Sequence, residues 1–222
     1  MSPKTPRAPW QIGVLVIVAV GGVLAGSLLG RQWLAAGRVG AKPVTRAAAV
    51  YDTPRPLPDF RLTDEAGREV TARTLRGRWT FLFFGYTHCP DVCPATLAQL
   101  AEVGRALTDL PGPAQPAVYL VSVDPARDTA ESLATYVHYF NPGFHALAGA
   151  PAAVEAFTRA LGIAVIVRRD GGAEYTVDHT AAILLVDPNG AVAAVFPAPH
   201  VVATIAADYR LIVAIRPDVR VR

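Results

Sequence analysis

A run of apolar and aromatic side chains at residues 79–85 constrains the fold of this chain more than any other feature. A strand with this composition is buried on both faces, so it belongs in the middle of a sheet that is covered by other layers. A helical pattern follows at residues 95–107, in which the apolar residues of one face are Leu97, Leu100, Val103 and Leu107. A central strand that passes into an amphipathic helix predicts an α/β domain.

Strand and helix patterns alternate through the rest of the domain. Residues 117–123 are predicted to form a second buried strand. Helical composition and periodicity are present at residues 129–140, 152–161 and 201–215. Turn residues separate three pairs of extended segments, which are interpreted as hairpins: residues 60–62 with 68–70, 163–168 with 173–177, and 181–186 with 191–196. The sequence thus predicts an α/β fold with a mixed sheet and flanking helices.

The chain contains two cysteines, Cys89 and Cys93, which lie between the central strand and the helix that follows it. A disulfide between residues four positions apart closes a very small loop and constrains little of the unfolded chain. The pair is therefore better explained by chemistry than by stabilisation, either metal binding or reversible thiol redox. A helix start supports both roles, because its backbone N–H groups and dipole favour thiolate over thiol.

Thiolates are soft ligands that select Cu(I), Zn or iron–sulfur chemistry. Two cysteines cannot complete a four-cysteine zinc or iron–sulfur site, so the other ligands must come from histidine, carboxylate, solvent or a partner protein. Met1 is the only methionine, so no thioether is available to the folded domain.

Five histidines compete for the role of third ligand. His179 stands out because it lies between a glycine-rich hairpin and an apolar strand, where a mixed sheet could bring it opposite the cysteines. His88 adjoins Cys89 and is expected to shape the loop. His138 lies in a helical stretch, and loop positions are expected for His145 and His200.

Charge and composition exclude a nucleic-acid surface. The formal net charge is only +3, and the basic residues are scattered rather than gathered into a stripe with aromatic side chains. The 222 residues, 52% of them hydrophobic, are enough for one soluble domain with an N-terminal extension.

Residues 12–30 are apolar and uncharged, and they are long enough to cross the hydrocarbon core of a membrane as a helix. We predict a single transmembrane anchor, flanked at the two interfaces by Trp10 and Trp33. A cleaved signal peptide is the alternative, although no convincing cleavage motif follows the run directly. A spacing that would let two such helices pack together is present at Gly22, Gly26 and Gly30.

The anchor divides the chain into the segments that we predict. Residues 1–11 form a short basic N-terminus, and residues 31–56 are interpreted as an extended linker because they are rich in alanine, arginine and then proline. The folded domain is predicted at residues 57–216, with a tail at 217–222. Basic residues are more numerous after the anchor than before it, so charge alone favours a cytoplasmic domain.

Three segments of the domain carry a resemblance to a known family. They are FFGYTHCPDVCP at residues 83–94, VDPARDT at residues 123–129 and VDHT at residues 177–180. In this order they resemble the Sco/SenC family of copper proteins, and the resemblance covers residues 57–213.

The resemblance implies a thioredoxin-like fold and copper, as Cu(I) or Cu(II), bound by Cys89, Cys93 and His179. It implies a role in assembling the binuclear copper centre of cytochrome c oxidase, without an enzymatic reaction as the main activity. The implied partners are the copper-bearing subunit of the oxidase and a copper donor protein. The implied location is the bacterial inner membrane with the domain in the periplasm, or the mitochondrial inner membrane with the domain in the intermembrane space.

Other residues of these motifs are expected to support the site. Asp124, Arg127 and Asp128 are expected to organise the loop that faces the metal, although Asp128 could instead cap the helix that begins near residue 129. Asp178 could tune the imidazole of His179 or only close the turn. Prolines at positions 90 and 94 are expected to fix the cysteine loop.

The main alternative function is that of a thiol–disulfide oxidoreductase that reduces cysteines of an oxidase subunit. Two features of the sequence oppose it as the main role. The spacing is CxxxC rather than CxxC, and no proline precedes the strand at residues 181–186, where thioredoxin-type enzymes place one. A third hypothesis is a peroxidase of the same fold or a redox sensor.

Overall fold

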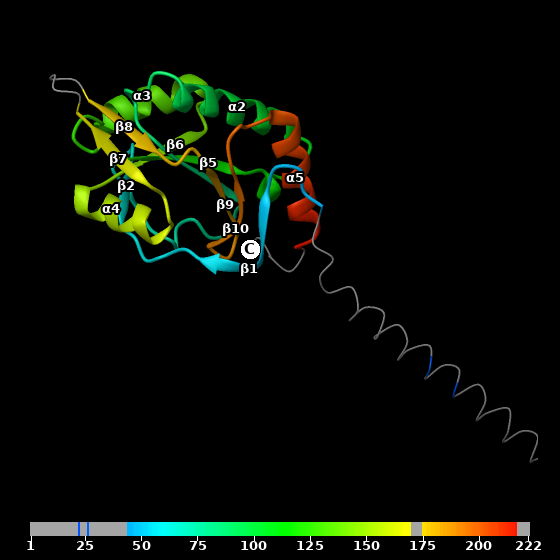
Figure 1. The fold of residues 1–222 in the computed structure, drawn as a ribbon. Helices are drawn as coiled ribbons and strands as arrows, with labels where there is room; N and C mark the ends of the chain where they lie inside the picture. The colour runs from blue at the N-terminus through cyan, green and yellow to red at the C-terminus, as the bar shows by residue number, and fades with distance from the viewer. Residues whose placement is uncertain (1–21, 23–25, 27–43, 170–174, 217–222) are drawn as a thin grey trace, which may run out of the picture. The chain divides into compact units, whose positions relative to one another are not determined.

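Figure 1 shows the computed structural model of the chain, which describes residues 22, 26, 44–169 and 175–216. The chain falls into two compact units, Met1–Lys42 and Pro43–Arg222, and the second contains both cysteines. The predicted anchor at residues 12–30 lies outside the described residues apart from two helical glycines, as do residues 1–11, 31–43 and 217–222. Within the described part of the chain, no helix combines the length and the apolar composition needed to span a membrane.

An eight-stranded mixed sheet forms the centre of the second unit, in the order β1-β10-β9-β4-β5-β6-β2-β3. Its strands are β1 (Ala49–Pro56), β2 (Leu62–Asp64), β3 (Glu69–Val70), β4 (Thr80–Gly85), β5 (Ala117–Ser122), β6 (Phe144–Ala148), β9 (Ile183–Val186) and β10 (Ala191–Phe196). β4 pairs in parallel with β5, and β5 with β6, while the other neighbours are antiparallel. The predicted mixed sheet is confirmed.

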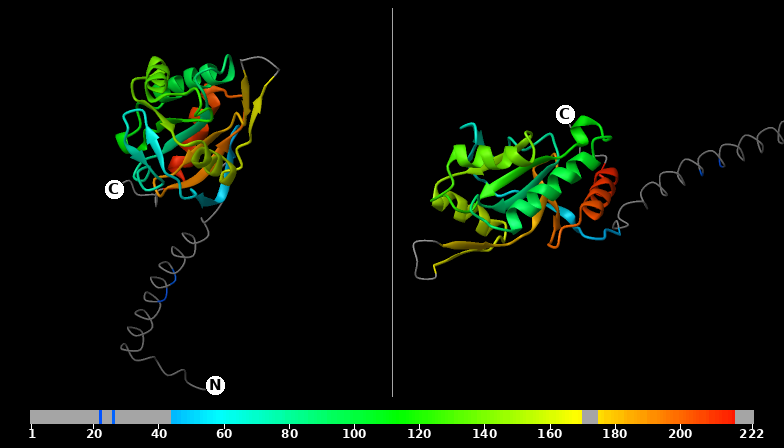
Figure 2. Two further views of the ribbon diagram at one scale, coloured as in Figure 1. Left: turned by 90° about the vertical axis from the view of Figure 1, so that its left-hand side faces the viewer. Right: turned by 90° about the horizontal axis from the view of Figure 1, so that it is seen from above.

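Helices cover both faces of this sheet, namely α2 (Val92–Ala106), α3 (Ala130–Phe140), α4 (Pro151–Ala160) and α5 (Val202–Ala214). In Figures 1 and 2, α2, α3 and α5 lie along one face and α4 lies on the other. Ring contacts agree, since Phe81 packs against Tyr209 of α5 while Phe84 packs against Phe157 of α4. Phe81 and Phe84 are an odd number of positions apart, so their side chains leave β4 on opposite faces.

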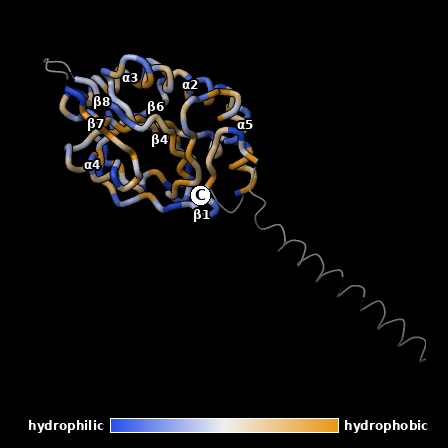
Figure 3. Tube along the Cα trace, viewed as in Figure 1, coloured by the Kyte–Doolittle hydropathy of each residue, from blue (hydrophilic) through white to orange (hydrophobic). Residues whose placement is uncertain are grey.

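Strand β4 lies at the centre of the core, as its composition predicts. All six of its residues are buried, and residues 81–84 have 0% exposure. Trp79, which precedes the strand, packs edge-on against Tyr209 with ring centroids 6.1 Å apart. Figure 3 shows hydrophobic residues along the central strands. β4 therefore gives the cysteine loop that follows it a rigid base.

The structure places an edge strand, β1, where the sequence predicts the last part of the linker. β1 pairs antiparallel with β10, with Val50 opposite Ala194 and Arg55 opposite Val192. Pro54 and Pro56 are compatible with this strand because an edge strand needs hydrogen bonds on one side only. The prolines that suggested a tether thus belong to the sheet, and the compact unit begins before residue 57.

Asp208 of α5 fastens the segment that leads into β1. Its carboxylate, which is 3% exposed, accepts hydrogen bonds of 2.7 to 3.0 Å from the backbone amides of Arg46, Ala47 and Ala48. Three backbone donors satisfy a buried charge that would otherwise be costly to remove from water. Residues 46–48 are therefore part of the folded unit.

Strand β6 was not predicted from the sequence. It has five residues, contains no β-branched side chain and lies between two helices, so no local pattern indicates it. Pairing with β5 and β2 creates this strand, and it places His145 in the sheet rather than in the predicted loop. The predicted hairpins are present as β2–β3 and β9–β10, and α2 begins three residues earlier than predicted, at Val92.

Two further strands, β7 (Val165–Arg168) and β8 (Thr176–His179), pair antiparallel as a separate two-stranded sheet. Figure 2 shows this hairpin extending from the rest of the unit. The residues between its described ends, 170–174, lie outside the described part of the chain. The predicted hairpin is confirmed, and His179 is the last residue of its second strand.

Candidate metal centre

The two cysteines lie on the connection between β4 and α2. Cys93 is the second residue of α2 and is fully buried, whereas Cys89 precedes the helix and is partly exposed. The Cys93 amide donates a hydrogen bond to the Cys89 sulfur over 3.4 Å, while Asp91, the N-cap residue, makes no side-chain cap. The Cys89 sulfur therefore takes the place of a capping oxygen at the positive end of the helix.

Gly85, the last residue of β4, leaves room for the sulfur of Cys93. A Cβ atom at Gly85 would lie 2.7 Å from Cys93 Sγ and 3.1 Å from a methyl group of Leu120. Because no side chain is present there, the start of α2 packs directly against the end of the central strand. This contact fixes the position of Cys93 against the buried central strand.

His179 brings its imidazole to the two sulfurs from the other side. Its Nε2 atom lies 3.3 Å from Cys93 Sγ, and its Nδ1 atom lies 3.3 Å from the Thr180 carbonyl oxygen. A proton on Nδ1 can be donated to that carbonyl, which leaves the Nε2 lone pair facing the sulfurs. The rings of Phe83 and Tyr86 pack edge-on against the imidazole at 5.9 and 6.2 Å.

One ligand atom from each of Cys89, Cys93 and His179 lies within 4.8 Å of the other two. Among the described residues, this is the one group of three such side chains that could hold a metal ion. Two ligands that each lie about 2.1–2.3 Å from one ion are separated by roughly 3.6–3.8 Å. The three atoms thus need only small shifts to share an ion, and two sulfurs with one imidazole suit Cu(I) or zinc.

The two cysteines differ in protonation. A hydrogen bond from the Cys93 thiol is the largest of the effects that lower the pKa of Cys89, to about 4. The same hydrogen bond, together with burial, raises the pKa of Cys93 well above its ordinary value. At neutral pH Cys89 is therefore a thiolate and Cys93 a thiol, so binding an ion through both sulfurs releases one proton.

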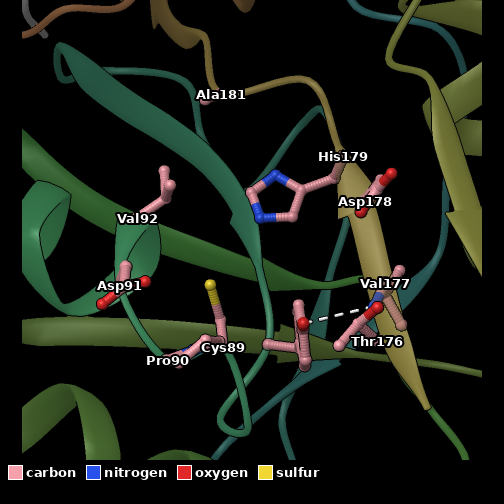
Figure 4. Close-up of a pocket in the computed structure, with 10 residues that line it drawn as sticks. Cys89, Pro90, Asp91, Val92, Thr176, Val177, Asp178, His179 and Ala181 are labelled. Carbon is pink, nitrogen blue, oxygen red and sulfur yellow. Dashed lines mark hydrogen bonds between the residues drawn. The ribbon is translucent and has the colours of Figure 1, made fainter. Parts of the chain in front are cut away.

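The site opens to solvent on one side. Figure 4 shows the Cys89 sulfur and the His179 imidazole pointing into the same pocket, which is lined by Tyr86, Cys89, Pro90, Asp91, Val92, Thr176, Val177, Asp178, His179 and Ala181. Cys93 does not line it. Two of the three ligands are thus reachable from outside, and the third is enclosed by the core.

Comparison with known proteins relates this geometry to a family. The sequence model of the SCO1/SenC family matches residues 50–214, which is most of the chain. The chain belongs to the SCO1/SenC family. It is 37% identical over 190 residues to the mitochondrial SCO2 homolog of Bos taurus, which covers 83% of this chain and 69% of that protein.

Solved Sco structures match the SCO1/SenC domain closely. ScoI of Arabidopsis thaliana, solved with copper bound, has a TM-score of 0.67 at 29% identity, over 71% of this chain and 97% of that chain. ScoI of Bradyrhizobium japonicum, also solved with copper bound, has a TM-score of 0.63 at 35% identity, over 70% of this chain and 98% of that chain. The predicted thioredoxin-like α/β fold is confirmed.

In this SCO1/SenC chain, Asp128 ties the cysteine loop to strand β5. Its carboxylate accepts hydrogen bonds from the Thr87 amide and hydroxyl at 3.2 and 2.6 Å, and from the Ser122 hydroxyl at 2.6 Å. The expectation that Asp128 organises the loop agrees with these contacts. Its alternative role as a helix cap is wrong, because Thr129 caps α3 in a reciprocal arrangement with Ser132.

Asp178 does not contact the imidazole of its neighbour. Its carboxylate pairs with Arg168 across the β7–β8 hairpin. His179 sits opposite Val165 in the same ladder, and successive side chains of a strand point to opposite faces. The hypothesis that Asp178 tunes His179 is therefore wrong, and the Thr180 carbonyl occupies the Nδ1 side instead.

The other histidines of the SCO1/SenC domain have partners away from the sulfurs. His145 contacts Glu65 at 2.9 Å, and His138 lies 3.9 Å from the same carboxylate. His200 is 8% exposed and contacts the Phe196 carbonyl oxygen, so it is a core residue rather than the loop residue that the sequence predicts. His88 bonds through Nδ1 to the Thr87 hydroxyl, within the cysteine loop as expected.

Sequence reasoning missed two tyrosines that border the site. Tyr86 accepts a hydrogen bond from the Val177 amide through its hydroxyl, at 3.2 Å, and its ring touches His179. The Tyr175 hydroxyl donates to Asp124 at 2.6 Å. The only signal in the sequence was position, since Tyr86 lies inside the cysteine motif and Tyr175 shortly before the histidine motif.

Proposed function

We propose that this protein is a copper chaperone that binds copper through Cys89, Cys93 and His179 and delivers it to the binuclear copper centre of cytochrome c oxidase. The observation that carries the proposal is the convergence of two sulfurs and one imidazole nitrogen within 4.8 Å in a member of the SCO1/SenC family. Two soft sulfurs favour copper over harder ions. The copper-bound relatives support the choice of metal.

The three ligands have different roles in this proposal. Cys93 is buried against Gly85 and holds the ion on the core. Cys89 and His179 line the open pocket, so ligands of an acceptor protein can replace them one at a time. A site with one enclosed ligand and two accessible ligands retains copper in the free protein and still permits transfer to a partner.

We further propose that residues 12–30 anchor the protein in a membrane with the domain on the oxidising side, in the periplasm or the mitochondrial intermembrane space. The apolar composition of these residues and family membership support this arrangement, although the charge count favours the opposite orientation. Alkaline phosphatase, fused after the last residue, should be active there. An inactive phosphatase fusion together with an active cytoplasmic reporter would contradict this orientation.

The proposed partners are a copper donor and the copper-bearing subunit of the oxidase. The pocket rim carries the side chain of Asp91 together with apolar Pro90, Val92 and Ala181. Such a rim can be covered by a partner with apolar and basic groups around its own copper ligands. Substitution of rim residues is expected to slow transfer without loss of copper retention.

The test of the main proposal is the variant His179→Ala. It removes the imidazole and leaves both sulfurs, so copper retention and oxidase assembly should fail. Cys89→Ala and Cys93→Ala should fail as well. His138→Ala, which removes a histidine that lies near Glu65 rather than near the sulfurs, should bind copper like the parent. If His179→Ala keeps full copper stoichiometry, an unchanged absorption spectrum and oxidase activity in a deletion strain, the three-ligand site must be abandoned.

A thiol–disulfide reductase is the second candidate, and the lowered pKa of Cys89 beside a buried thiol favours it. The Cys89 thiolate would attack a partner disulfide, and the first partner sulfur would leave as a thiolate. Cys93, after losing its proton, would then attack Cys89 and release the second partner sulfur. The reaction leaves a Cys89–Cys93 disulfide in this protein. The partner gains two electrons and becomes two thiols, with one proton from Cys93 and one from solvent. Such an enzyme needs both sulfurs, whereas His179 only helps to lower the pKa of Cys89. Loss of copper together with retained thiol exchange in His179→Ala therefore separates the two functions.

A further inference from the structure

The third ligand of the site is carried by an element outside the main sheet. Strands β7 and β8 pair with each other, and within the described ranges neither joins the eight-stranded sheet. At the base of the hairpin, the Thr180 amide donates to the Ala164 carbonyl oxygen and the Ala164 amide donates to the Thr180 hydroxyl, both over 3.0 Å. The two cysteines, in contrast, are fixed on β4 and α2. The distance between His179 and the sulfurs therefore depends on how the hairpin is docked.

Arg127 contacts this hairpin at Tyr175, the residue before β8. Its Nη1 donates to the Tyr175 carbonyl oxygen over 3.0 Å, and its guanidinium carbon lies 3.7 Å from the centre of the Tyr175 ring. Asp124 completes the contact, because it accepts from both the Arg127 guanidinium and the Tyr175 hydroxyl. Tyr175 immediately precedes β8, so these bonds hold the strand that ends in His179.

Tyr86 connects this contact to the metal ligands. The centre of the Tyr86 ring lies 5.6 Å from the guanidinium carbon of Arg127. The Tyr86 hydroxyl accepts a hydrogen bond from the amide of Val177 in β8. The same ring packs edge-on against His179. The hairpin thus rests on one surface made by the Arg127 guanidinium and the Tyr86 ring.

The loop that carries Arg127 also holds the cysteines. Its neighbour Asp128 bonds to Thr87, two residues before Cys89. The short loop after β5 therefore bonds to both parts of the site. Asp128 bonds to the cysteine loop, and Arg127 bonds to the hairpin that carries His179.

We propose that Arg127 is a positioning residue that sets His179 at ligand distance from Cys89 and Cys93, acting through Tyr175 and Tyr86. Arg127 touches none of the three ligands. Without it, the hairpin remains formed by its own ladder but is no longer held against the sulfurs. The inference rests on the proposed copper site, and it adds that the third ligand is held by tertiary contacts from the 124–128 loop.

The experiment compares Arg127→Met with Arg210→Met in the full-length chain. Arg210 is a matched control because it also donates to a backbone carbonyl, that of Ala106, and pairs with an aspartate, Asp109, but it lies on α5 away from the site. Hydrogen exchange of the peptide that contains Val177 is measured without copper. Nitrogen superhyperfine structure in the Cu(II) electron paramagnetic resonance spectrum is measured with copper, and thermal unfolding is measured for all variants.

In Arg127→Met we expect exchange at Val177 to accelerate by about tenfold or more, because a charge-assisted bond and a ring contact are lost. The nitrogen signal of the copper-loaded protein should be lost while sulfur coordination remains. Arg127→Lys should not restore it, since a lysine lacks the planar fork that stacks on Tyr175 and donates to its carbonyl. Tyr175→Phe keeps the ring and loses the hydrogen bond to Asp124. It should also accelerate hydrogen exchange at Val177, by a smaller factor than Arg127→Met. Arg210→Met should change only the unfolding temperature.

The proposal would be overturned if Arg127→Met showed the same rate of hydrogen exchange at Val177 as the parent chain and an intact nitrogen signal. If Arg127→Met does not fold, Tyr175→Phe is the deciding variant. A rate of hydrogen exchange at Val177 equal to that of the parent chain in Tyr175→Phe also overturns the proposal. A parent chain that shows no nitrogen ligand would instead contradict the proposed copper site. The exchange measurement without copper would then still decide whether Arg127 docks the hairpin.

Discussion

Replacement of Gly85 by alanine tests how the core fixes the buried sulfur. The new Cβ atom would lie 2.7 Å from Cys93 Sγ, 3.1 Å from Leu120 Cδ1 and 3.3 Å from Phe83 Cε1. The first distance falls at least about 0.7 Å short of an ordinary 3.4–4 Å contact, so the sulfur must move. Both other neighbours are fully buried and leave it little space.

Overpacking of this kind costs about 1–3 kcal/mol of unfolding free energy. For a domain of this size, each kcal/mol lowers the unfolding temperature by about 2–4 °C, so a loss of about 2–12 °C is expected. Displacement of one of three ligands should weaken copper binding by about 10–100-fold, the range seen when the support of a metal ligand is disturbed. Calorimetry of the metal-free protein and competition with a copper chelator measure the two effects.

Gly104→Ala is the matched control, because it adds the same methyl group to α2, the helix that carries Cys93. Apart from its chain neighbours and the backbone of α2 itself, no described atom lies within 4 Å of its added Cβ, and alanine stabilises a helix interior relative to glycine by about 0.5–1 kcal/mol. The control should be slightly more stable and should bind copper like the parent. If Gly85→Ala binds copper as tightly as the parent and unfolds at the same temperature, the steric argument for Cys93 is refuted.

Two further predictions concern the boundary of the domain and the thiolate. A chain of residues 57–216 should be less stable to urea than one of residues 44–216 by about 1–3 kcal/mol or more, because buried Asp208 loses the amides that bond to it and β10 loses its pairing with β1; equal midpoints would contradict this. The depressed pKa of Cys89 keeps the thiolate as pH falls until it is protonated near pH 4, so alkylation at pH 6 should approach its plateau rate. In Cys93→Ala, which lacks the hydrogen-bonding thiol, this rate should fall; an unchanged rate would exclude that bond as the cause.

The apolar run of β4 and the periodic helices are local features, and the sequence was sufficient to predict them. Burial of a strand on both faces requires an apolar residue at almost every position, so residues 79–85 indicate a central strand without reference to any other segment. β1 and β6 lack such a pattern. Each exists because a neighbouring strand offers hydrogen bonds, and a partner that is distant in the chain leaves no local trace.

The sequence by itself determined the ligand types, because two cysteines at a helix start favour soft-metal or redox chemistry and one histidine lay in a segment that a sheet could bring near. Only the tertiary structure decided that His179, 86 residues from Cys93, reaches its sulfur at 3.3 Å. It also decided that Cys93 is enclosed while Cys89 faces the pocket, and that Arg127 bonds to the strand before His179. The physical reason is that residue type sets which bonds an atom can make, whereas packing of β4, α2 and the β7–β8 hairpin sets which atoms meet.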